Sequence, residues 1–419
     1  MYRALRWSEH YTKTDMIYLS KGGFWLFLSY AVAVLVGLAV SVSFAHFLPK
    51  ETFGIYKFVI GIFGILTALS LTGLRTALVP AIARGESGIL RSGFFFHLRW
   101  SMLVTLSSVA VALYYYTQGN MTLFFSLLIV GSTAPFFLSS SLYASYFEGR
   151  KLFRAKFFLN LVHNSTPAIT LISTALLTSN PLILIAVYFF SNTATVLLLY
   201  LFTVRHYTLP VARSRNVEKN AVHLSAMNIP AIIAGGIDAI LIFHFLGATP
   251  LAIYAFALAP ISHLSGGTKI LKTLILPKVS SRDFSEVGKS LFGKTIKLFL
   301  ALTVVAGAYV LFAPYLFSFL FPQYMEAVIY SQVLAISLLL SANIPIVQTF
   351  IGHSKMKEMY TLRFLSSGTR IVALLVLVPL YGLWGAVAAI LISGVVDLAT
   401  PIISLWWIQV FGKRTDTQV

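Results

Sequence analysis

Long apolar runs separated by short polar gaps dominate this sequence. Twelve such runs are about 20 residues long or more, and that length is typical of a membrane-spanning helix. Transmembrane β-strands would instead be about ten residues long and alternate in polarity. The pattern therefore predicts an all-α integral membrane protein with twelve transmembrane helices. The predicted spans cover residues 24–48, 55–79, 93–116, 121–146, 157–178, 181–204, 223–246, 250–275, 295–319, 326–349, 362–381 and 383–408.

The composition excludes most other classes of protein. Of the 419 residues, 58% are hydrophobic and 11% are charged, whereas soluble domains are about 45–50% apolar and about 25% charged. Cysteine is absent, so disulfides and thiolate metal sites are excluded. The net charge of +18 does not indicate nucleic acid binding, because the basic residues lie in short gaps and form no patch on a folded domain.

The distribution of lysine and arginine predicts the orientation in the membrane. Of the 31 lysine and arginine residues, all but three are predicted to lie on the same side of the membrane as the N-terminus. The exceptions are Lys50, Lys57 and Arg75. Cytoplasmic loops carry the excess of basic residues, so we expect both termini in the cytoplasm. Residues 1–21 have no pattern of a cleaved signal peptide. We therefore expect a multi-pass protein of the plasma membrane.

An internal repeat relates the two halves of the chain. Residues 46–58 (HFLPKETFGIYKF) match residues 244–256 (HFLGATPLAIYAF) without a gap, and Phe147 and Gly149 recur as Phe350 and Gly352. A repeat of six spans preserves orientation, which predicts two six-helix lobes related by a parallel repeat with a site between them, as in transporters. The predicted parts are an N-terminal tail (1–21), an N-lobe (22–204), a basic linker (205–222), a C-lobe (223–408) and a C-terminal tail (409–419).

The sequence lacks the motifs of common catalytic sites. It contains no phosphate-binding GxxxxGK[ST] loop, no HExxH, no GxSxG and no DxD. We therefore expect no enzyme activity, no catalytic residues, no metal and no cofactor.

Ionisable residues inside a span are costly and mark candidate sites. Asp238 lies deep in span 7, after Pro230 and Gly235, where it can act as a proton- or cation-linked switch or bond to a neighbouring helix. Arg75 lies in span 2, and because the apolar stretch continues to Ala83, it is roughly 12 Å inside Arg84. Its guanidinium can bind phosphate or extend to the membrane surface.

Further candidates occupy other spans. Lys269 and Lys272 share one face of span 8, and Arg370 lies about eight residues inside span 11; each can bind a ligand or simply flank its span. For Asp397 in span 12 we favour helix packing. His163 and Asn164 in span 5, with Asn160, favour hydrogen bonds between helices. Four buried bases against two buried acids indicate an anionic ligand.

The segment 22–85 resembles the start of polysaccharide biosynthesis flippases, the O-antigen (Wzx-type) branch of the multidrug/oligosaccharidyl-lipid/polysaccharide exporter superfamily. The features that carry this resemblance are a first span ending in FLPKETFGIY and a second ending in GLRTALVPAIAR. FEGRKLFRAK (147–156) and YGLWGAVAAILIS (381–393) add to it.

The resemblance implies a function. Family members turn an oligosaccharide on a polyprenyl pyrophosphate across the membrane by alternating access of two six-helix lobes, whose spans 1, 2, 7 and 8 line a central cavity. It implies that Arg75, Lys269 and Lys272 meet the pyrophosphate, that Arg370 contributes, and that Asp238 couples transport to H⁺ or Na⁺. We expect a monomer among membrane lipids, with a glycan polymerase or ligase as a possible partner.

Two alternatives remain open from the sequence. One is a cation-coupled multidrug or small-solute antiporter of the same fold. Its span 1 would often carry acidic residues, and here span 1 has none. The other is a membrane glycan polymerase or transferase, which would usually need carboxylates in a sizeable outer loop.

Overall fold

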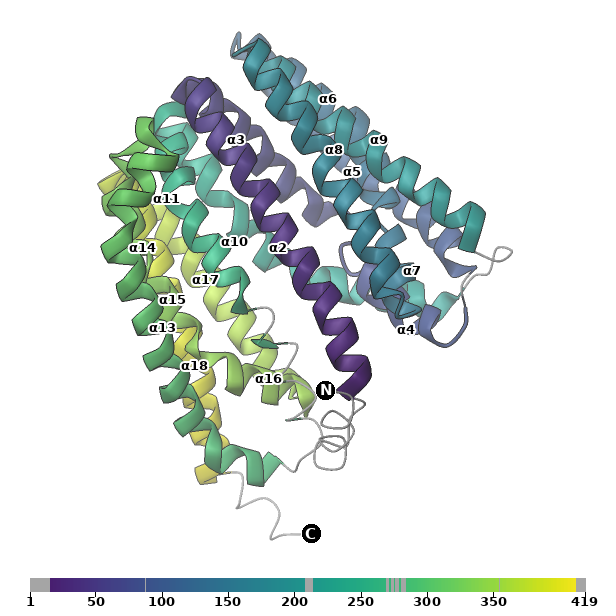
Figure 1. Cartoon of the computed structure of the whole chain (residues 1–419), viewed down its shortest axis with the longest axis vertical. Coiled ribbons are helices and arrows are strands. Elements are labelled where there is room, and N and C mark those ends of the chain that lie inside the picture. The colour runs from purple at the N-terminus through teal and green to yellow at the C-terminus, as the bar shows by residue number, and fades with distance from the viewer. Residues whose placement is uncertain are drawn as a thin grey trace. The chain divides into compact units, whose positions relative to one another are not determined.

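A computed structural model describes residues 16–86, 88–207, 214–268, 271–272, 275, 279, 284–353 and 355–411. Within these residues every regular element is a helix (Figure 1). The all-α prediction is therefore confirmed for the described part of the chain. The chain divides into two compact units, which we call unit 1 (residues 1–232) and unit 2 (residues 233–419).

Unit 1 is built from long helices that pack along one another. Helix α8 packs against both α2 and α9, and α6 packs against α5 and α9 (Figure 1). The first half of α10 also belongs to this unit. The helices are α2 (Met16–Phe47), α3 (Lys50–Leu66), α4 (Leu74–Ala83), α5 (Ile89–Thr117), α6 (Met121–Ser140), α7 (Tyr143–Gly149), α8 (Phe153–Leu177), α9 (Pro181–Tyr207) and α10 (Arg215–Leu246).

Unit 2 contains the rest of α10 and the helices that follow it. Its most extensive helix pair is α17 with α18, joined by a turn at Gly382. The helices are α11 (Ala248–Gly266), α13 (Phe284–Leu320), α14 (Ala327–Leu334), α15 (Ile336–Leu340), α16 (Ile344–Gly352), α17 (Met356–Tyr381) and α18 (Leu383–Phe411).

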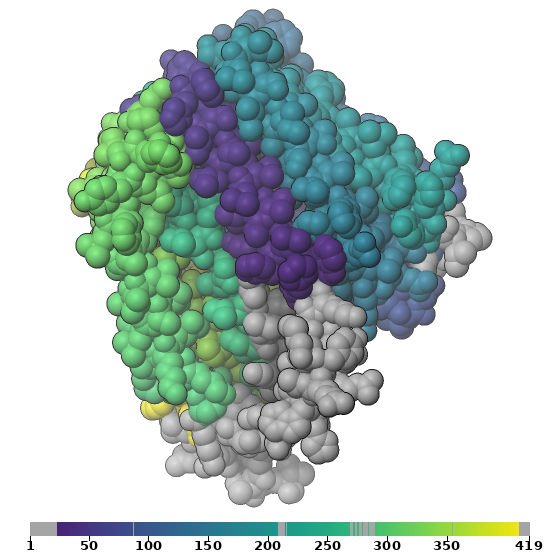
Figure 2. All heavy atoms as spheres, viewed as in Figure 1, coloured from purple at the N-terminus to yellow at the C-terminus, as the bar shows by residue number. Residues whose placement is uncertain are grey.

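The outward-facing side chains are those of a membrane protein. Large apolar residues are mostly exposed on several helices, including Leu106 of α5, Leu198 of α9 and Phe319 of α13, which is 80% exposed. Figure 2 shows α2, in purple, uncovered along its length on one face. Apolar surface of this extent is not tolerated in water. Eleven helices of the described residues are long and apolar enough to cross a membrane, so this is a multi-pass membrane protein.

The sequence predicted span 2 as one helix over residues 55–79, and this prediction is wrong. The chain forms α3, a short 3₁₀ helix at Thr67–Leu69, and then a break before α4 begins at Leu74. At the break the Thr67 hydroxyl donates to the carbonyl of Gly64 and the Ser70 hydroxyl donates to the carbonyl of Thr67. Such local bonds compete with the helical ladder and bend it.

Two other predicted spans are also interrupted. Span 4 consists of α6 and α7, which meet at Ser141, where the hydroxyl donates to the Leu138 carbonyl. Span 10 consists of α14, α15, a 3₁₀ helix at Ser341–Asn343 and α16. The second pieces of these spans, α7 and α16, end at Gly149 and Gly352, the two glycines that the internal repeat pairs. Apolar runs predicted the spans but not these breaks.

Two glycines fix the short helix α4 in unit 1. A Cβ on Gly73 would lie 2.7 Å from the backbone nitrogen of Ser225 in α10, and one on Gly149 would lie 2.9 Å from the carbonyl oxygen of Val79. The Ser225 hydroxyl also accepts a 2.9 Å hydrogen bond from the Gly73 N–H. Backbones that approach so closely leave room only for glycine. Helix α4 is therefore held at its start by α10 and along its length by α7.

Replacing Gly149 by alanine should destabilise unit 1. The new Cβ would lie 2.8 Å from the Cβ of Ile82, and overpacking of this kind costs about 1–3 kcal/mol. The purified variant should therefore unfold at a lower temperature in detergent. Gly64→Ala is the matched control, because Gly64 lies in α3 with open space at its Cβ position and alanine there gains about 0.5–1 kcal/mol. Equal melting temperatures would contradict the close packing of α4 on α7.

Candidate functional site

A polar cavity of about 320 Å³ lies inside unit 1, and we call it the unit 1 cavity. Four helical segments form its walls, namely α2, the start of α4, the α6–α7 junction and the first half of α8. The lining residues are Ser29, Tyr30, Ala33, Arg75, Ser141, Tyr143, Ala144, Lys156, Asn160, His163 and Asn164.

Arg75 reaches this cavity because span 2 is broken. It is the second residue of α4, and its neighbours Leu74 and Leu78 are buried in the core of unit 1. The arginine side chain instead points away from that core and is 51% exposed. Its position at the start of a helix adds the positive end of the helix dipole to its own charge. Both features favour an anion at this place.

A single carboxylate holds two basic side chains beside the cavity. Glu148 of α7 accepts a hydrogen bond from Arg75 and another, of 2.7 Å, from the Lys156 ammonium, both at Oε1. The Lys156 side chain is 12% exposed and Glu148 is 25% exposed. Two cations against one anion leave a surplus positive charge. A guanidinium has five N–H donors, so Arg75 keeps donors for a ligand.

Helix α8 supplies the remaining polar wall. His163 lies with its Nδ1 3.1 Å from the hydroxyl of Tyr143, which ties α8 to α7. Asn160 and Asn164 are half-buried and line the same cavity. Asn164 and His163, two of the residues singled out from the sequence, thus line the same cavity as Arg75.

In unit 2 the structure brings Asp238 and Arg370 together. Asp238 of α10 is 6% exposed, and its Oδ2 accepts a 2.8 Å bond from the Tyr254 hydroxyl and a 3.2 Å bond from Arg370. The N–H of Ala239 donates to the other oxygen at 2.9 Å. Helices α10, α11 and α17 thus meet at one carboxylate. The sequence placed Asp238 and Arg370 on different spans and gave no sign of this ion pair.

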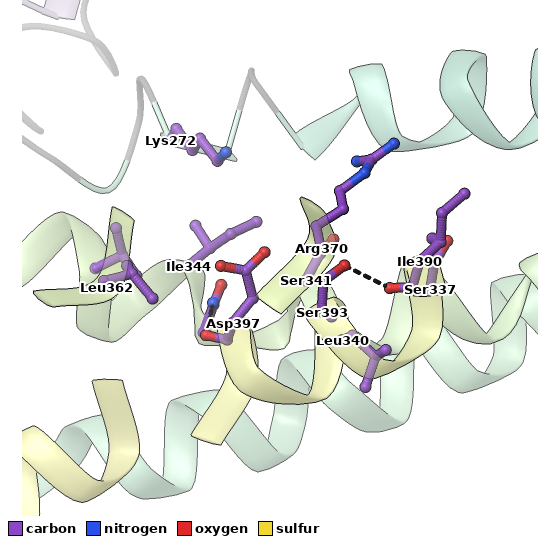
Figure 3. A pocket seen from close by; sticks show the side chains of 13 residues that line it. Lys272, Ser337, Leu340, Ser341, Ile344, Leu362, Arg370, Ile390, Ser393 and Asp397 are labelled. Atoms are coloured by element: carbon purple, nitrogen blue, oxygen red, sulfur yellow. Dashed lines mark hydrogen bonds between the residues drawn. The ribbon is translucent and has the colours of Figure 1, made fainter. Parts of the chain in front are cut away.

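A second cavity, of about 310 Å³, lies in unit 2 and we call it the unit 2 cavity (Figure 3). Lys272, Arg370 and Asp397 carry its charges, and the Arg370 Nε is buried with no hydrogen-bond partner in the described part of the chain. The backbone carbonyl of Asp397 accepts a bond from the Asn343 amide. The other lining residues are Ser337, Leu340, Ser341, Asn343, Ile344, Val347, Leu362, Ile390, Ser393 and Gly394.

The four predicted basic residues are therefore not gathered in one described cavity. Arg75 lines the unit 1 cavity, Lys272 and Arg370 line the unit 2 cavity, and Lys269 lies outside the described residues. In the described part of unit 2, the two acids Asp238 and Asp397 balance these two bases. Among the described residues that line the two cavities, the surplus positive charge lies at the cluster of Arg75, Lys156 and Glu148.

Sequence reasoning missed the partners that position Arg75. Glu148 and Lys156 follow predicted span 4 in a charged gap, and no spacing rule connects them with Arg75, which lies more than 70 positions earlier. The available signal was the rarity of acids, because only 13 residues are acidic and Glu148 interrupts the basic segment FEGRKLFRAK. Tyr254 was missed as a partner of Asp238 because it resembles any other aromatic residue of a span.

A family model for polysaccharide biosynthesis proteins matches residues 19–281, which is more than half of the chain. No curated protein matches the chain in sequence.

Several solved structures share the fold at 14% sequence identity. The lipid II flippase MurJ in an inward closed conformation matches with a TM-score of 0.71, over 92% of this chain and 87% of that chain. An outward-facing multidrug resistance MATE family transporter of the MOP superfamily gives 0.64, over 94% and 96%. A MOP superfamily transporter from Pyrococcus furiosus gives 0.61, over 94% and 96%.

These structural matches establish the fold, and the family model establishes the family. The chain has the fold of MOP superfamily transporters, and it belongs to the polysaccharide biosynthesis protein family.

Proposed function

We propose that this protein is a flippase of the plasma membrane that translocates an oligosaccharide linked to polyprenyl pyrophosphate, for the assembly of a surface polysaccharide or glycan. Membership of the polysaccharide biosynthesis family supports a glycan cargo. A structural relative, MurJ, is a lipid II flippase, which supports a lipid-linked one. Transport proceeds by alternating access and without covalent chemistry.

The observation that carries this proposal is the surplus positive charge at Arg75 and Lys156. A pyrophosphate is a compact anion with several acceptor oxygens, and a half-exposed guanidinium beside an ammonium that is 12% exposed suits it. A cationic drug would find no free negative charge in this cluster, because Glu148 is already neutralised by two cations. The pocket of the Pyrococcus furiosus relative is described as reversed in polarity, with a different function suggested. Pocket charge therefore distinguishes members of this fold.

In unit 2, Lys269, Lys272 and Arg370 provide further contacts for the anionic head group during transport. Asp238 couples transport to H⁺ or Na⁺, because neutralising its carboxylate would release Arg370. Asp397 lines the same cavity and has a secondary role. In this proposal the protein is a monomer with twelve spans and both termini in the cytoplasm. It passes its cargo to a polymerase or ligase.

Helix α8 is the twelfth span in this proposal. It has 25 residues, enough to cross a membrane, but it is absent from the eleven apolar helices of the described residues. Its Lys156, Asn160, His163 and Asn164 lower its hydropathy, and all four line the unit 1 cavity. A span is expected to be less apolar where it borders a polar cavity.

Arg75→Ala should reduce export of the lipid-linked oligosaccharide by about 10- to 100-fold, since a hydrogen bond to a charged group contributes about 1.5–3 kcal/mol. Folding should survive, because Lys156 still neutralises Glu148. The measurement is the amount of lipid-linked oligosaccharide on each leaflet, together with surface glycan, in a host that expresses only the variant.

The matched control for this experiment is Arg84→Ala. Arg84 is at the end of α4 and pairs with Glu86, but it does not line the unit 1 cavity. It should export normally. Normal export by Arg75→Ala at wild-type protein levels would contradict the proposed site.

The ion pair in unit 2 can be tested by a double-mutant cycle. Asp238→Asn or Arg370→Gln alone leaves a charge without its partner in a low-dielectric site, so each should lower stability by up to about 3 kcal/mol. The double variant removes both charges and should recover the melting temperature of the wild type. Transport should remain lost in the double variant, because the proposed coupling requires the Asp238 carboxylate and the proposed head-group contact requires the Arg370 guanidinium.

The outcome separates a coupling role from a structural one. Recovery of both stability and transport in the double variant would mean that Asp238 and Arg370 only hold α10 and α17 together. Asp397→Asn in the otherwise wild-type protein is the comparison, because Asp397 borders the same cavity and feels the charge of Arg370, but the ion pair that Arg370 forms among the described residues is with Asp238.

A further inference from the structure

One face of α8 carries polar groups that the ion cluster at Glu148 does not use. Lys156, Asn160 and Asn164 are spaced by four residues, and His163 follows Asn160 by three, so all four lie toward one side of the helix. All four line the unit 1 cavity. Lys156 is committed to Glu148 and His163 to Tyr143, which leaves the two amides.

The amides of Asn160 and Asn164 have no hydrogen-bond partner among the described residues. Each amide offers two donors and an acceptor. Polar groups in a membrane-spanning helix are costly and are kept where they meet a partner or line a path. Both side chains are half-buried in the cavity wall, so a ligand in the cavity can reach them.

The neighbouring groups indicate the chemical class of that ligand. Neutral amides, hydroxyls and an aromatic ring fix the orientation of a ligand that is itself rich in donors and acceptors, and Ser29 and Tyr30 supply the hydroxyls and the ring from α2. An inorganic anion would bind preferentially to the basic side chains of Arg75 and Lys156. A sugar, with several hydroxyl groups and no charge, matches the amide side of the cavity.

Size and position point to one particular sugar. The cavity, at about 320 Å³, is at the lower end of the range of about 300–1,000 Å³ for small-molecule pockets, so it suits a sugar ring and not a whole oligosaccharide. Asn160 and Asn164 follow Lys156 by four and eight residues, roughly 6 and 12 Å along the helix. A pyrophosphate at Arg75 would place the first sugar beside them.

We propose that Asn160 and Asn164 bind the sugar that is joined directly to the pyrophosphate, so that the unit 1 cavity recognises the junction between lipid carrier and glycan. His163, held by Tyr143, positions this face of α8. The inference rests on the proposed function, which supplies the pyrophosphate-linked cargo.

The test compares two lipids that differ by one sugar. Purified protein in nanodiscs is titrated with undecaprenyl pyrophosphate and with undecaprenyl pyrophosphate carrying one N-acetylglucosamine. In the Asn160→Ala/Asn164→Ala variant, affinity for the sugar-bearing lipid should fall about tenfold, as expected for the loss of two neutral hydrogen bonds. Affinity for the bare lipid should stay within about twofold of the wild type. Arg75→Ala should weaken both lipids.

Thr166→Ala is the matched control, because Thr166 is an exposed polar residue of α8 that does not line the cavity. It should bind both lipids as the wild type does. An unchanged affinity of the double variant for the sugar-bearing lipid would overturn the inference, as would equal weakening of both lipids. If the wild type binds neither lipid, the proposed function itself fails, which is a distinguishable result.

Discussion

A charge inside a membrane helix is stable only beside an opposite charge or in a wet cavity, and each unit of this protein meets that requirement around one carboxylate. In unit 1, Glu148 receives two basic side chains, so the cluster keeps a positive charge next to an open cavity. In unit 2, Asp238 receives one guanidinium and one hydroxyl, so that cluster is neutral. The first arrangement suits the binding of an anion. The second joins three helices at the Asp238 carboxylate, and neutralising that carboxylate would loosen the contact.

The helix breaks are what allow the charges to meet. If span 2 continued as one straight helix through Thr67–Gly73, the packing of α3 would fix the direction in which the Arg75 side chain points. Because the helix breaks there, the separate packing of α4 fixes that direction instead. The break frees α4 to pack on α10 through Gly73 and on α7 through Gly149, and this brings Arg75 beside Glu148. Small residues and local hydroxyl bonds therefore determine the electrostatics of the cavity, although none of them carries a charge.

This dependence explains how far the sequence could predict the structure. The length of the apolar runs predicted the number and approximate position of the long helices. Arg75 and Asp238 could be singled out because they are ionisable residues inside such runs. The pairing of Arg75 with Glu148, or of Asp238 with Arg370, depends on packing between residues 73 and 132 positions apart. No local pattern encodes that distance. The helix breaks at Ser70 and Ser141 could not be predicted from the sequence either, because serine and threonine occur at many other positions of the spans without interrupting the helix.

An amphiphilic cargo requires polar and apolar surfaces side by side, and α2 offers both. Ser29 and Tyr30 turn toward the unit 1 cavity, whereas Phe24, Phe27 and Leu35 are more than half exposed. No residue between Gly23 and Ser43 of α2 is buried, and the helix is uncovered on the face seen in Figure 2. A lipid chain that follows this apolar side can remain in the bilayer while its head group reaches Arg75. Because the lipid chain then never leaves apolar surroundings, only the head group needs a polar site, and this accounts for a cavity of small-molecule size in a protein proposed to carry a long lipid.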